Sequence, residues 1–445
     1  MIAALLACGG PDDPDAALTL TDVGVSASEW VPTVQTVTWT TPAPATSRVR
    51  AERDDGTAVE REDLALVTEH EVTLHGLVAG RTYDVVASST SADGEEASSG
   101  VVSVAIEGAP SWVPSFTLSN VDPARHAGGY VLLNVGSDAA SGVVIVDREG
   151  DPVWWAEAGE QVLSTATALR RDGSAVILAS QDLGMGGAAG TLVEVALDGS
   201  WRVEHPAPGL HHAFAELPSG ELAFVSAELA EVDGVRVIED LVRVVGEDGE
   251  VRDLFRALDH FEPAARCSHY APVAYAEGAT DWLHANGLAW DEAAGALYLM
   301  ARNWDALVAL DPDTGSPLRQ IGGSESALDW AAGAEDPWDH AHHSVMVADG
   351  VALLDNGAHR DPEWTRAAEY GWSSGELELV WEYWDPEGRS VPALGDVRRL
   401  DGGNRLVAWG TLGFVTELAD QDVVWQADAE VGYGVGWVQH LAELP

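Results

Sequence analysis

The chain has 445 residues, of which 46% are hydrophobic, and its 73 acidic against 23 basic side chains give a formal net charge of -50. This apolar content excludes wholesale disorder, and the length allows two to four domains of about 100–200 residues each. The negative field repels phosphate backbones, so no nucleic acid is expected as a partner, and the lack of any Lys excludes Schiff-base chemistry and a P-loop nucleotide site.

Residues 1–17 predict a lipoprotein signal remnant followed by an acidic tether. The run Leu5-Leu6-Ala7-Cys8 resembles the lipobox of bacterial lipoproteins, in which the Cys is lipidated. We therefore expect a lipid on Cys8 that anchors the protein to a membrane of the bacterial cell envelope, facing the periplasm or the cell surface. The following run GGPDDPDAA is typical of a solvated linker. A lipidated Cys8 would leave Cys267 without a partner for a disulfide.

Residues 18–107 predict an all-β domain. The segment Val34–Thr41 alternates along its length and is rich in β-branched residues, as strands are. The segment His70–Ser91 is typical of a strand, a short turn and a second strand led by Tyr83. With Trp39 on an early strand, this region resembles a fibronectin type III domain, a β-sandwich that implies a spacer or binding module. No constellation of catalytic side chains is apparent in it.

Residues 108–445 repeat a strand, an acidic turn and a second strand that often carries Trp. The first four turn spacings are 49, 50, 66 and 60 residues, and the turns contain Gly150, Gly199, Gly249, Gly315, Gly375 and, in the sixth, Asp420-Gln421-Asp422. A second kind of strand pair alternates with the first. Repeats of this length with four short strands each predict a β-propeller, here with six blades. We expect Gly128–Val135 to pair with a C-terminal strand and close the circle of blades.

Histidines cluster at the starts of three successive repeats. They are six of the 14 in the chain, namely His211, His212, His284, His340, His342 and His343. His212 and His342 both lie eight residues before the glycine of the following turn, Gly220 and Gly350. Equal offsets on the innermost strands place these imidazoles at equivalent depth in a central channel. A single buried His is more often a packing residue, whereas three in register predict a functional site.

The segments around these histidines resemble the bacterial arylsulfotransferases. The matching pieces are DWLHANGLAWD (Asp281–Asp291), LYLMARNWDALVALDPDTG (Leu297–Gly315), HHAFAELPSGEL (His211–Leu222), HHSVMVADGVALLDNGAHR (His342–Arg360) and GDVRRLDGGNRLVAWG (Gly395–Gly410). They extend over the whole expected propeller, and a β domain in front of it also fits the family.

The resemblance implies an all-β, six-bladed propeller with its site in the central channel. It also implies that a sulfuryl group passes from an aryl sulfate to a phenol through a sulfated histidine, without a nucleotide. The catalytic positions of the family fall on His342 as nucleophile, on Arg302 as sulfate-binding cation, and on His284 and His212. Further expected substrate contacts are Asn286, His211, His340, His343, Asn356 and Arg360.

The sequence departs from the family pattern beside two of the imidazoles. Family members often carry Asp where this chain has His343 and Ala213. The sequence therefore leaves open which side chain orients the nucleophile. It also leaves His340 and His343 as alternatives to His342 for that role.

The residue types suit sulfuryl transfer with no metal or cofactor. Neutral imidazole is a nucleophile near pH 7, and the guanidinium of Arg302 can hold two sulfate oxygens. A protonated second imidazole can donate to the leaving phenolate. Two alternatives are a propeller that binds sulfated or aromatic ligands without turnover, and a metal-dependent hydrolase that uses the His cluster.

Overall fold

A computed structural model describes residues 17–137, 140–159, 162–182, 190–263, 278–331, 337–348, 350–430 and 432–444. The predictions for Cys8 and Cys267 lie outside these residues. The chain divides into two compact units, residues 1–109 with 198–200 and 445, and residues 110–197 with 201–444. Both units consist mainly of β-strands, and no helix in the described ranges is long and apolar enough to cross a membrane.

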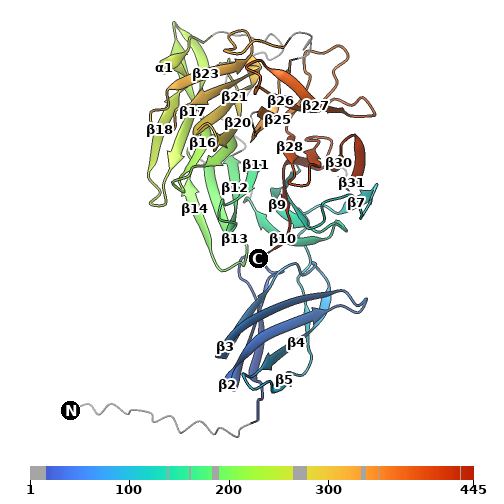
Figure 1. The fold of residues 1–445 in the computed structure, drawn as a ribbon. Coiled ribbons are helices and arrows are strands. Elements are labelled where there is room, and N and C mark those ends of the chain that lie inside the picture. Colours follow the sequence, from blue (N-terminus) through green and yellow to red (C-terminus); the bar gives the residue numbers. More distant parts are fainter. Residues whose placement is uncertain are drawn as a thin grey trace, which may run out of the picture. The chain divides into compact units, whose positions relative to one another are not determined.

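The first unit is a six-stranded antiparallel sheet (Figure 1). Its strands are β1 (Thr21–Ala27), β2 (Gln35–Glu52), β3 (Ala58–Leu74), β4 (Thr82–Thr90), β5 (Glu96–Ser98) and β6 (Val102–Ala105). The register of β2 against β3 shifts between Thr40 and Ser47. The first half of β2 pairs with β1 and the end of β3, whereas its second half pairs with the start of β3 and with β4. Trp39, Leu77 and Tyr83 pack into one core.

Three sheets of the second unit are formed by four consecutive strands each. The first contains β11 (Val162–Leu169), β12 (Ala175–Asp182), β13 (Gly190–Ala196) and β14 (Arg202–Pro206). The second contains β20 (Ala285–Asp291), β21 (Ala296–Ala301), β22 (Ala306–Leu310) and β23 (Pro317–Gly322). The third contains β24 (His342–Val347), β25 (Gly350–Asp355), β26 (Arg366–Gly371) and β27 (Glu378–Trp384). The hairpins of these sheets are those that the two kinds of sequence repeat predict.

Two further sheets add a fifth strand to the same plan. One contains β15 (Leu210–Glu216), β16 (Leu222–Val232), β17 (Val235–Val245) and β18 (Val251–Arg256), with β19 (Thr280–Asp281) parallel to β17; the short helix α1 (Ala257–His260) follows β18. The other contains β28 (Asp396–Arg399), β29 (Arg405–Ala408), β30 (Phe414–Ala419) and β31 (Asp422–Ala429), with β7 (Phe116–Ser119) on its outer edge.

The remaining sheet joins the two ends of the second unit. It contains β8 (Tyr130–Gly136), β9 (Ser141–Val146), β10 (Pro152–Glu157) and the C-terminal strand β32 (Gly434–Leu441). Tyr130 of β8 pairs with Leu441 of β32, and Val135 pairs with Val435. The predicted pairing of the segment 128–135 with a C-terminal strand is confirmed.

In the second unit, one edge strand of each sheet contacts an edge strand of the next sheet. The contacts run from β11 to β15, β20, β24, β28 and β32, and β32 contacts β11 again. A cavity of about 250 Å³ is lined by residues of all six strands, which therefore surround one axis. The all-β fold with its four-stranded antiparallel sheets is consistent with a β-propeller.

Apolar strands and Trp side chains fill the spaces within and between the sheets. Every residue of β21 and β25 is buried, and each fully buried large aliphatic side chain contributes about 1.5–3 kcal/mol. Most Trp residues of the repeats pack in this core as expected, among them Trp154, Trp338 and Trp425. Trp201 is an exception, because 38% of it is exposed.

Candidate active site

The edge strands that carry the histidines have β-bulges near their first residues. The register shifts between Leu210 and Phe214 in β15, between Ala285 and Gly287 in β20, and between His342 and Val345 in β24. His212, His284 and His343 lie at or beside these bulges and have φ angles of 58°, 53° and 48°. Positive φ is uncommon and strained for residues other than glycine. The bulges therefore redirect side chains at this end of the strands.

The structure brings together three imidazoles from three different sheets. The ring centroid of His212 lies 5.0 Å from that of His284 and 6.0 Å from that of His342. His342 is buried, whereas His212 and His284 are partly exposed. Three rings at this spacing are close enough to contact the same small ligand.

Asn356 holds the imidazole of His342 and fixes its tautomer. The amide nitrogen of Asn356 donates to the carbonyl oxygen of Val391 at 2.7 Å, so the amide oxygen faces His342. This oxygen lies 2.7 Å from Nδ1 of His342 and can only accept. Nδ1 therefore carries the proton, and Nε2 keeps its lone pair. The asparagine supplies the orienting acceptor that the sequence left open.

The other two imidazoles have orienting partners of their own. Nδ1 of His284 lies 2.5 Å from a carboxylate oxygen of Asp281, and although burial opposes it, the charge and hydrogen bond of His284 hold the pKa of Asp281 below its usual value. Nδ1 of His212 lies 2.8 Å from Nδ1 of His211. Nε2 of His211 lies 3.2 Å from a carboxylate oxygen of Asp240. His211 is thus placed behind His212.

Arg302 supplies a buried positive charge beside the three imidazoles. It begins the short 3-10 helix η2 (Arg302–Trp304), directly after β21, and is 3% exposed. Its backbone N–H donates to the carbonyl of His284 at 3.2 Å, which fixes the helix against the start of β20. Burial and the charge of Arg302 hold the pKa of His342 well below its usual value. His342 is consequently neutral, as a nucleophile must be.

Three further residues that the sequence assigned to the substrate contact other protein groups. The amide nitrogen of Asn286 donates to the carbonyl of Ala341, so it joins β20 to β24. The His343 ring packs on Trp437 with centroids 3.4 Å apart and lines the 250 Å³ cavity. Arg360 pairs with the buried carboxylate of Asp355 at 2.6 Å. These contacts give all three a structural role, and their contact with a substrate stays a prediction.

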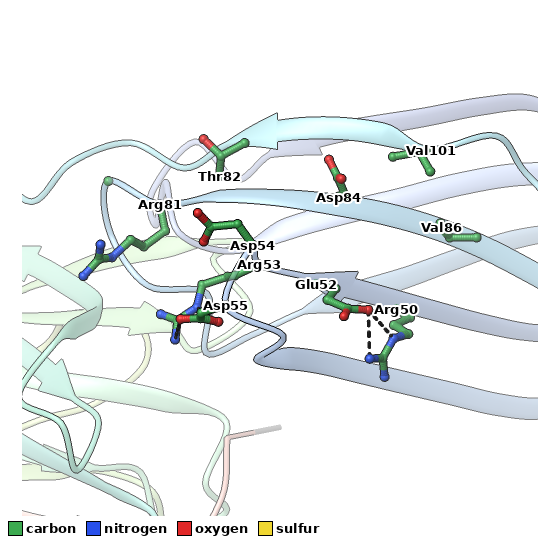
Figure 2. A pocket seen from close by; sticks show the side chains of 11 residues that line it. Arg50, Glu52, Arg53, Asp54, Asp55, Arg81, Thr82, Asp84, Val86 and Val101 are labelled. Atoms are coloured by element: carbon green, nitrogen blue, oxygen red, sulfur yellow. Dashed lines mark hydrogen bonds and ion pairs between the residues drawn. The ribbon is translucent and has the colours of Figure 1, made fainter.

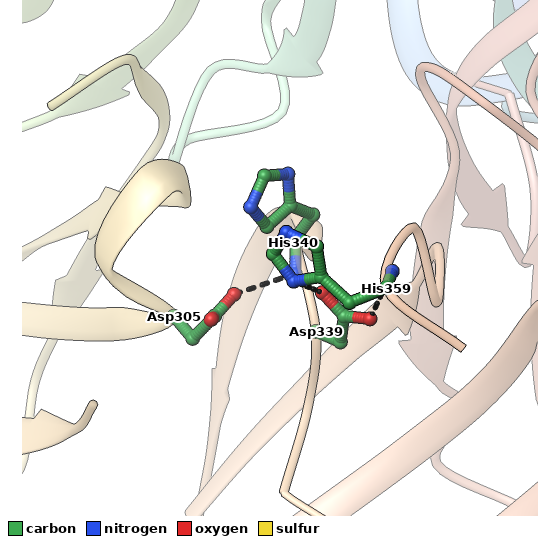
Figure 3. A group of neighbouring side chains, drawn as sticks. All are labelled: Asp305, Asp339, His340 and His359. Atoms are coloured by element: carbon green, nitrogen blue, oxygen red, sulfur yellow. Dashed lines mark hydrogen bonds and ion pairs between the residues drawn. The ribbon is translucent and has the colours of Figure 1, made fainter. Parts of the chain in front are cut away.

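His340 belongs to a separate cluster of side chains. It lies with Asp305, Asp339 and His359, which approach one another from η2 and from the segments on either side of β24 and β25 (Figure 3). The backbone N–H of His340 donates to Asp305 at 2.6 Å. Burial, with the nearby carboxylates of Asp339 and Asp355, raises the pKa of Asp305 to about 7. The ring of His340 packs edge-on against that of His359 rather than among the rings of the three imidazoles.

The first unit has a surface hollow of about 640 Å³ (Figure 2). Its charged side chains pair with each other, Arg50 with Glu52 and Arg53 with Asp55. Its lining contains neither His nor Cys. This hollow has the character of a solvated, charged surface.

Sequence reasoning missed the partners that hold the imidazoles. Asp281 lies three residues before His284, and this spacing was a usable signal. Asp240 lies in the interior of β17, far along the chain from His211. Only the folded sheet therefore brings these two residues together. Asp305, Asp339 and His359 were likewise not singled out.

The low pKa values of three histidines predict a pH-dependent stability. Burial is the largest cause that lowers the pKa of His212, His342 and His343 well below 6.5. Below about pH 6.5 the unfolded chain therefore binds protons that the folded protein does not, and each pKa unit costs about 1.4 kcal/mol. We expect the free energy of unfolding to fall less between pH 7.5 and pH 5 in His343→Gln than in the original protein.

Urea unfolding at several pH values measures this difference. Buried carboxyls have the opposite effect on stability. The pKa of Asp147 is raised to about 6 and that of Asp305 to about 7, so protonation of both stabilises the fold as the pH falls. For this reason the pH dependence is compared between variants. His260→Gln, at an exposed site on α1, is the matched control. Equal pH slopes for His343→Gln and the control would contradict the prediction.

The described sheets and the clustered imidazoles define a propeller-like protein with a polar centre. The model of the arylsulfotransferase (ASST) family matches residues 117–431, and the chain belongs to this family of aryl-sulfate sulfotransferases. A comparison with curated proteins finds no match.

Two solved structures that resemble this chain share little sequence with it. A protein of unknown function from Bacteroides caccae has 13% identity and a TM-score of 0.43, over 68% of this chain and 94% of that one. An auxiliary nutrient binding protein from Bacteroides ovatus has 11% identity and a TM-score of 0.38, over 95% and 91% of the two chains.

Proposed function

We propose that the protein transfers a sulfuryl group from an aryl sulfate to a phenol, with His342 as the nucleophile and a sulfohistidine as the intermediate. The observation that carries this proposal is the hydrogen bond between His342 Nδ1 and Asn356, which leaves Nε2 with a lone pair. Family membership supports the reaction class. The ring of His212 lies close to those of His284 and His342, and the charge of Arg302 acts on His342.

In the first half-reaction, Nε2 of His342 attacks sulfur in line with the leaving phenol oxygen. The new S–N bond forms as the S–O bond to the aryl group breaks, and the electron pair of that bond stays on the phenol oxygen. His284, held by Asp281, is placed to give this oxygen a proton when its ring is protonated. The guanidinium of Arg302 supplies donors for the sulfate oxygens, on which negative charge is held throughout.

The second half-reaction reverses these steps on an acceptor phenol. A neutral imidazole takes the proton of the acceptor, whose oxygen attacks sulfur, and the S–N bond breaks to restore His342. His284, left neutral by the first half-reaction, takes this proton and so returns to its starting state. His212 lies 5.0 Å from it and stays neutral, because burial and the neighbouring histidines hold its pKa well below the usual value. Neither step requires a group beyond these side chains and the two substrates.

Intact-mass analysis after mixing with 4-nitrophenyl sulfate tests the proposal. Without an acceptor, we expect the mass of one sulfuryl group on the protein, located on the peptide that contains His342, and a burst of one equivalent of 4-nitrophenol. Addition of phenol should remove the label and yield phenyl sulfate. Saturable binding of 4-nitrophenyl sulfate with no covalent label would instead support a non-catalytic binding module.

The contact of Asn356 with His342 predicts a positioning effect on the rate. We expect Asn356→Ala to lower kcat by about 10²-fold, because the imidazole then loses both its direction and its preferred tautomer. Asn356→Asp should recover most of the rate, since a carboxylate also accepts from Nδ1. It should also move the acid limb of the pH–rate profile upward, because the new negative charge raises the pKa of His342. Steady-state rates across pH measure both effects, and a purely structural asparagine would not produce the shift.

The finer architecture is also part of the proposal. We propose that the six sheets are the blades of a closed six-bladed propeller, supported by the contacts that run around all six inner strands. We propose a fibronectin type III-like domain for the first unit. It is supported by Tyr83, at the start of β4, whose hydroxyl oxygen accepts from the backbone N–H of Val78 at 3.0 Å, as in the tyrosine corner of such sandwiches.

Lipidation of Cys8 and a location in the cell envelope are likewise proposals, supported by the sequence at residues 5–8. Expression of the full chain with a labelled fatty acid, compared with Cys8→Ser, tests them. Label in both proteins or in neither would contradict the anchor.

A further inference from the structure

We propose that Asp305, Asp339, His340 and His359 form a binding site for a divalent transition-metal ion, with zinc as the ion that fits best. Each residue offers one ligand atom, and these atoms all lie within 4.8 Å of one another. Among the described residues, this is the group of His, Cys, Asp and Glu side chains with such a geometry. The site is separate from the three imidazoles of the proposed sulfuryl transfer.

The set of ligand atoms selects the class of ion. Two imidazole nitrogens and two carboxylate oxygens suit zinc and other first-row divalent ions, whereas calcium and magnesium prefer oxygen alone. Zinc takes four such ligands in a tetrahedron at about 2.0–2.2 Å from the metal. The side chains need only turn inward to reach these distances, since no two ligand atoms are farther apart than 4.8 Å.

Backbone N–H groups already orient both carboxylates. The N–H of His340 donates to Asp305 Oδ1 at 2.6 Å, and the N–H of His359 donates to Asp339 Oδ2 at 2.6 Å. The second oxygen of each carboxylate is therefore the one that would coordinate. Outer hydrogen bonds of this kind are a usual feature of protein metal sites, because they fix the ligands before the metal arrives.

A cation would also relieve the repulsion between nearby carboxylates. Asp355 adjoins the cluster through the backbone N–H of Asp339, which donates to it at 2.9 Å. Two guanidiniums, from Arg360 and Arg366, contact the same Oδ2 of Asp355. The carboxylates of Asp305 and Asp339 share their space with two imidazoles, which are neutral when they bind a metal. A divalent ion matches the charge of these two carboxylates.

The site has a path for an ion to enter. His340 is 0% exposed, which places one ligand in the interior. The side chain of His359 is 36% exposed and forms the outer wall of the cluster. Nδ1 of His359 now lies 2.7 Å from Asp339 Oδ1, so a metal that enters between them replaces the proton of that contact. Binding should consequently weaken as the pH falls.

The ion would connect three segments that carry the proposed active site. Asp305 follows Arg302 by three residues, His340 precedes His342 by two, and His359 follows Asn356 by three. In this position the metal braces the guanidinium, the nucleophile and its orienting amide without touching a substrate. This effect on activity rests on the proposed function, whereas the metal site itself does not.

Metal binding by the untagged full chain, after treatment with a chelator, tests the proposal. Zn²⁺ is added and unbound metal is removed by gel filtration. We expect one equivalent of Zn²⁺ per chain by elemental analysis, a higher Tm with the metal, and visible d–d absorption typical of four-coordinate Co²⁺ when Co²⁺ replaces Zn²⁺. Absence of saturable Zn²⁺ binding in the original protein would overturn the site.

Four variants locate the metal. His359→Ala and Asp305→Asn should weaken Zn²⁺ binding at least about 100-fold, and His359→Ala should fold because its side chain is at the surface. His260→Ala is the matched control for the loss of an exposed imidazole and should bind as the original does. His342→Ala should also retain the metal, although it removes the proposed nucleophile. Loss of the metal in His342→Ala, or its retention in His359→Ala, would overturn the assignment and place the ion elsewhere.

Discussion

His342→Ala should abolish sulfuryl transfer, with a loss in kcat of about 10⁴–10⁶-fold, as when other enzymes lose their nucleophile. The methyl group left behind cannot form the S–N bond, so the covalent intermediate and the burst of 4-nitrophenol should both disappear. The release of 4-nitrophenol and the intact mass of the protein measure these two effects separately. His342 is the first residue of β24, and its ring contacts Asn356. We therefore expect its removal to leave the other imidazoles and Arg302 in place.

The neighbouring histidines provide matched controls for this result. His343→Ala removes a ring that packs on Trp437, and it should lower the unfolding free energy while transfer falls less than about tenfold. His340→Ala removes a member of the cluster with Asp305 and should still form the sulfated protein. Transfer that persists in His342→Ala and is lost in either control would assign the nucleophile to that control residue.

The second large effect is expected for Arg302. Arg302→Ala should lower kcat by about 10²–10³-fold, the loss typical of one donor that stabilises charge in a transition state. Arg302→Lys should recover only part of this rate, because an ammonium group lacks the planar fork that holds two oxygens. The rate of 4-nitrophenol release at saturating donor concentration measures the loss.

A second measurement separates a role in catalysis from one in structure. The charge of Arg302 contributes, after burial, to the low pKa of His342 and also lowers that of His212. Arg302→Ala should therefore raise the pKa of His342 and move the acid limb of the pH–rate profile upward, whereas Arg302→Lys should keep it low. An unchanged limb in Arg302→Ala would contradict the proposed proximity of the guanidinium to the nucleophile.

The periodic parts of this fold could be predicted from the sequence. The alternating repeats around Gly150 and Gly199 are hairpins, and β8 pairs with β32 as expected. The hairpins follow from strand patterns and turn residues, which are local signals, whereas the pairing of β8 with β32 follows from the closure of the circle of blades. The convergence of His212, His284 and His342 followed from the register of repeats, because equal offsets in equivalent strands place side chains at one level.

The supporting contacts could not be predicted in this way. Asn356 replaces an expected carboxylate, and its role depends on the carbonyl of Val391, which fixes the direction of the amide. Asp240 reaches His211 from a strand two positions away in the same sheet. Arg360, which the sequence predicts as a substrate contact, pairs with the buried carboxylate of Asp355. Only the folded backbone brings such partners together, and no spacing in the sequence predicts them.

The pairing of β8 with β32 has a consequence for how the protein folds. Tyr130 and Leu441 lie opposite each other in the sheet although almost the whole second unit separates them along the chain. The entropy of closing so long a loop must be lost before that sheet is complete. During synthesis, β8 therefore leaves the ribosome long before β32. Until β32 emerges, the edge of β8 that will pair with it is exposed and can pair with other strands. We expect this unit to mature slowly, as a single late event, and to depend on whatever shields that edge in the meantime.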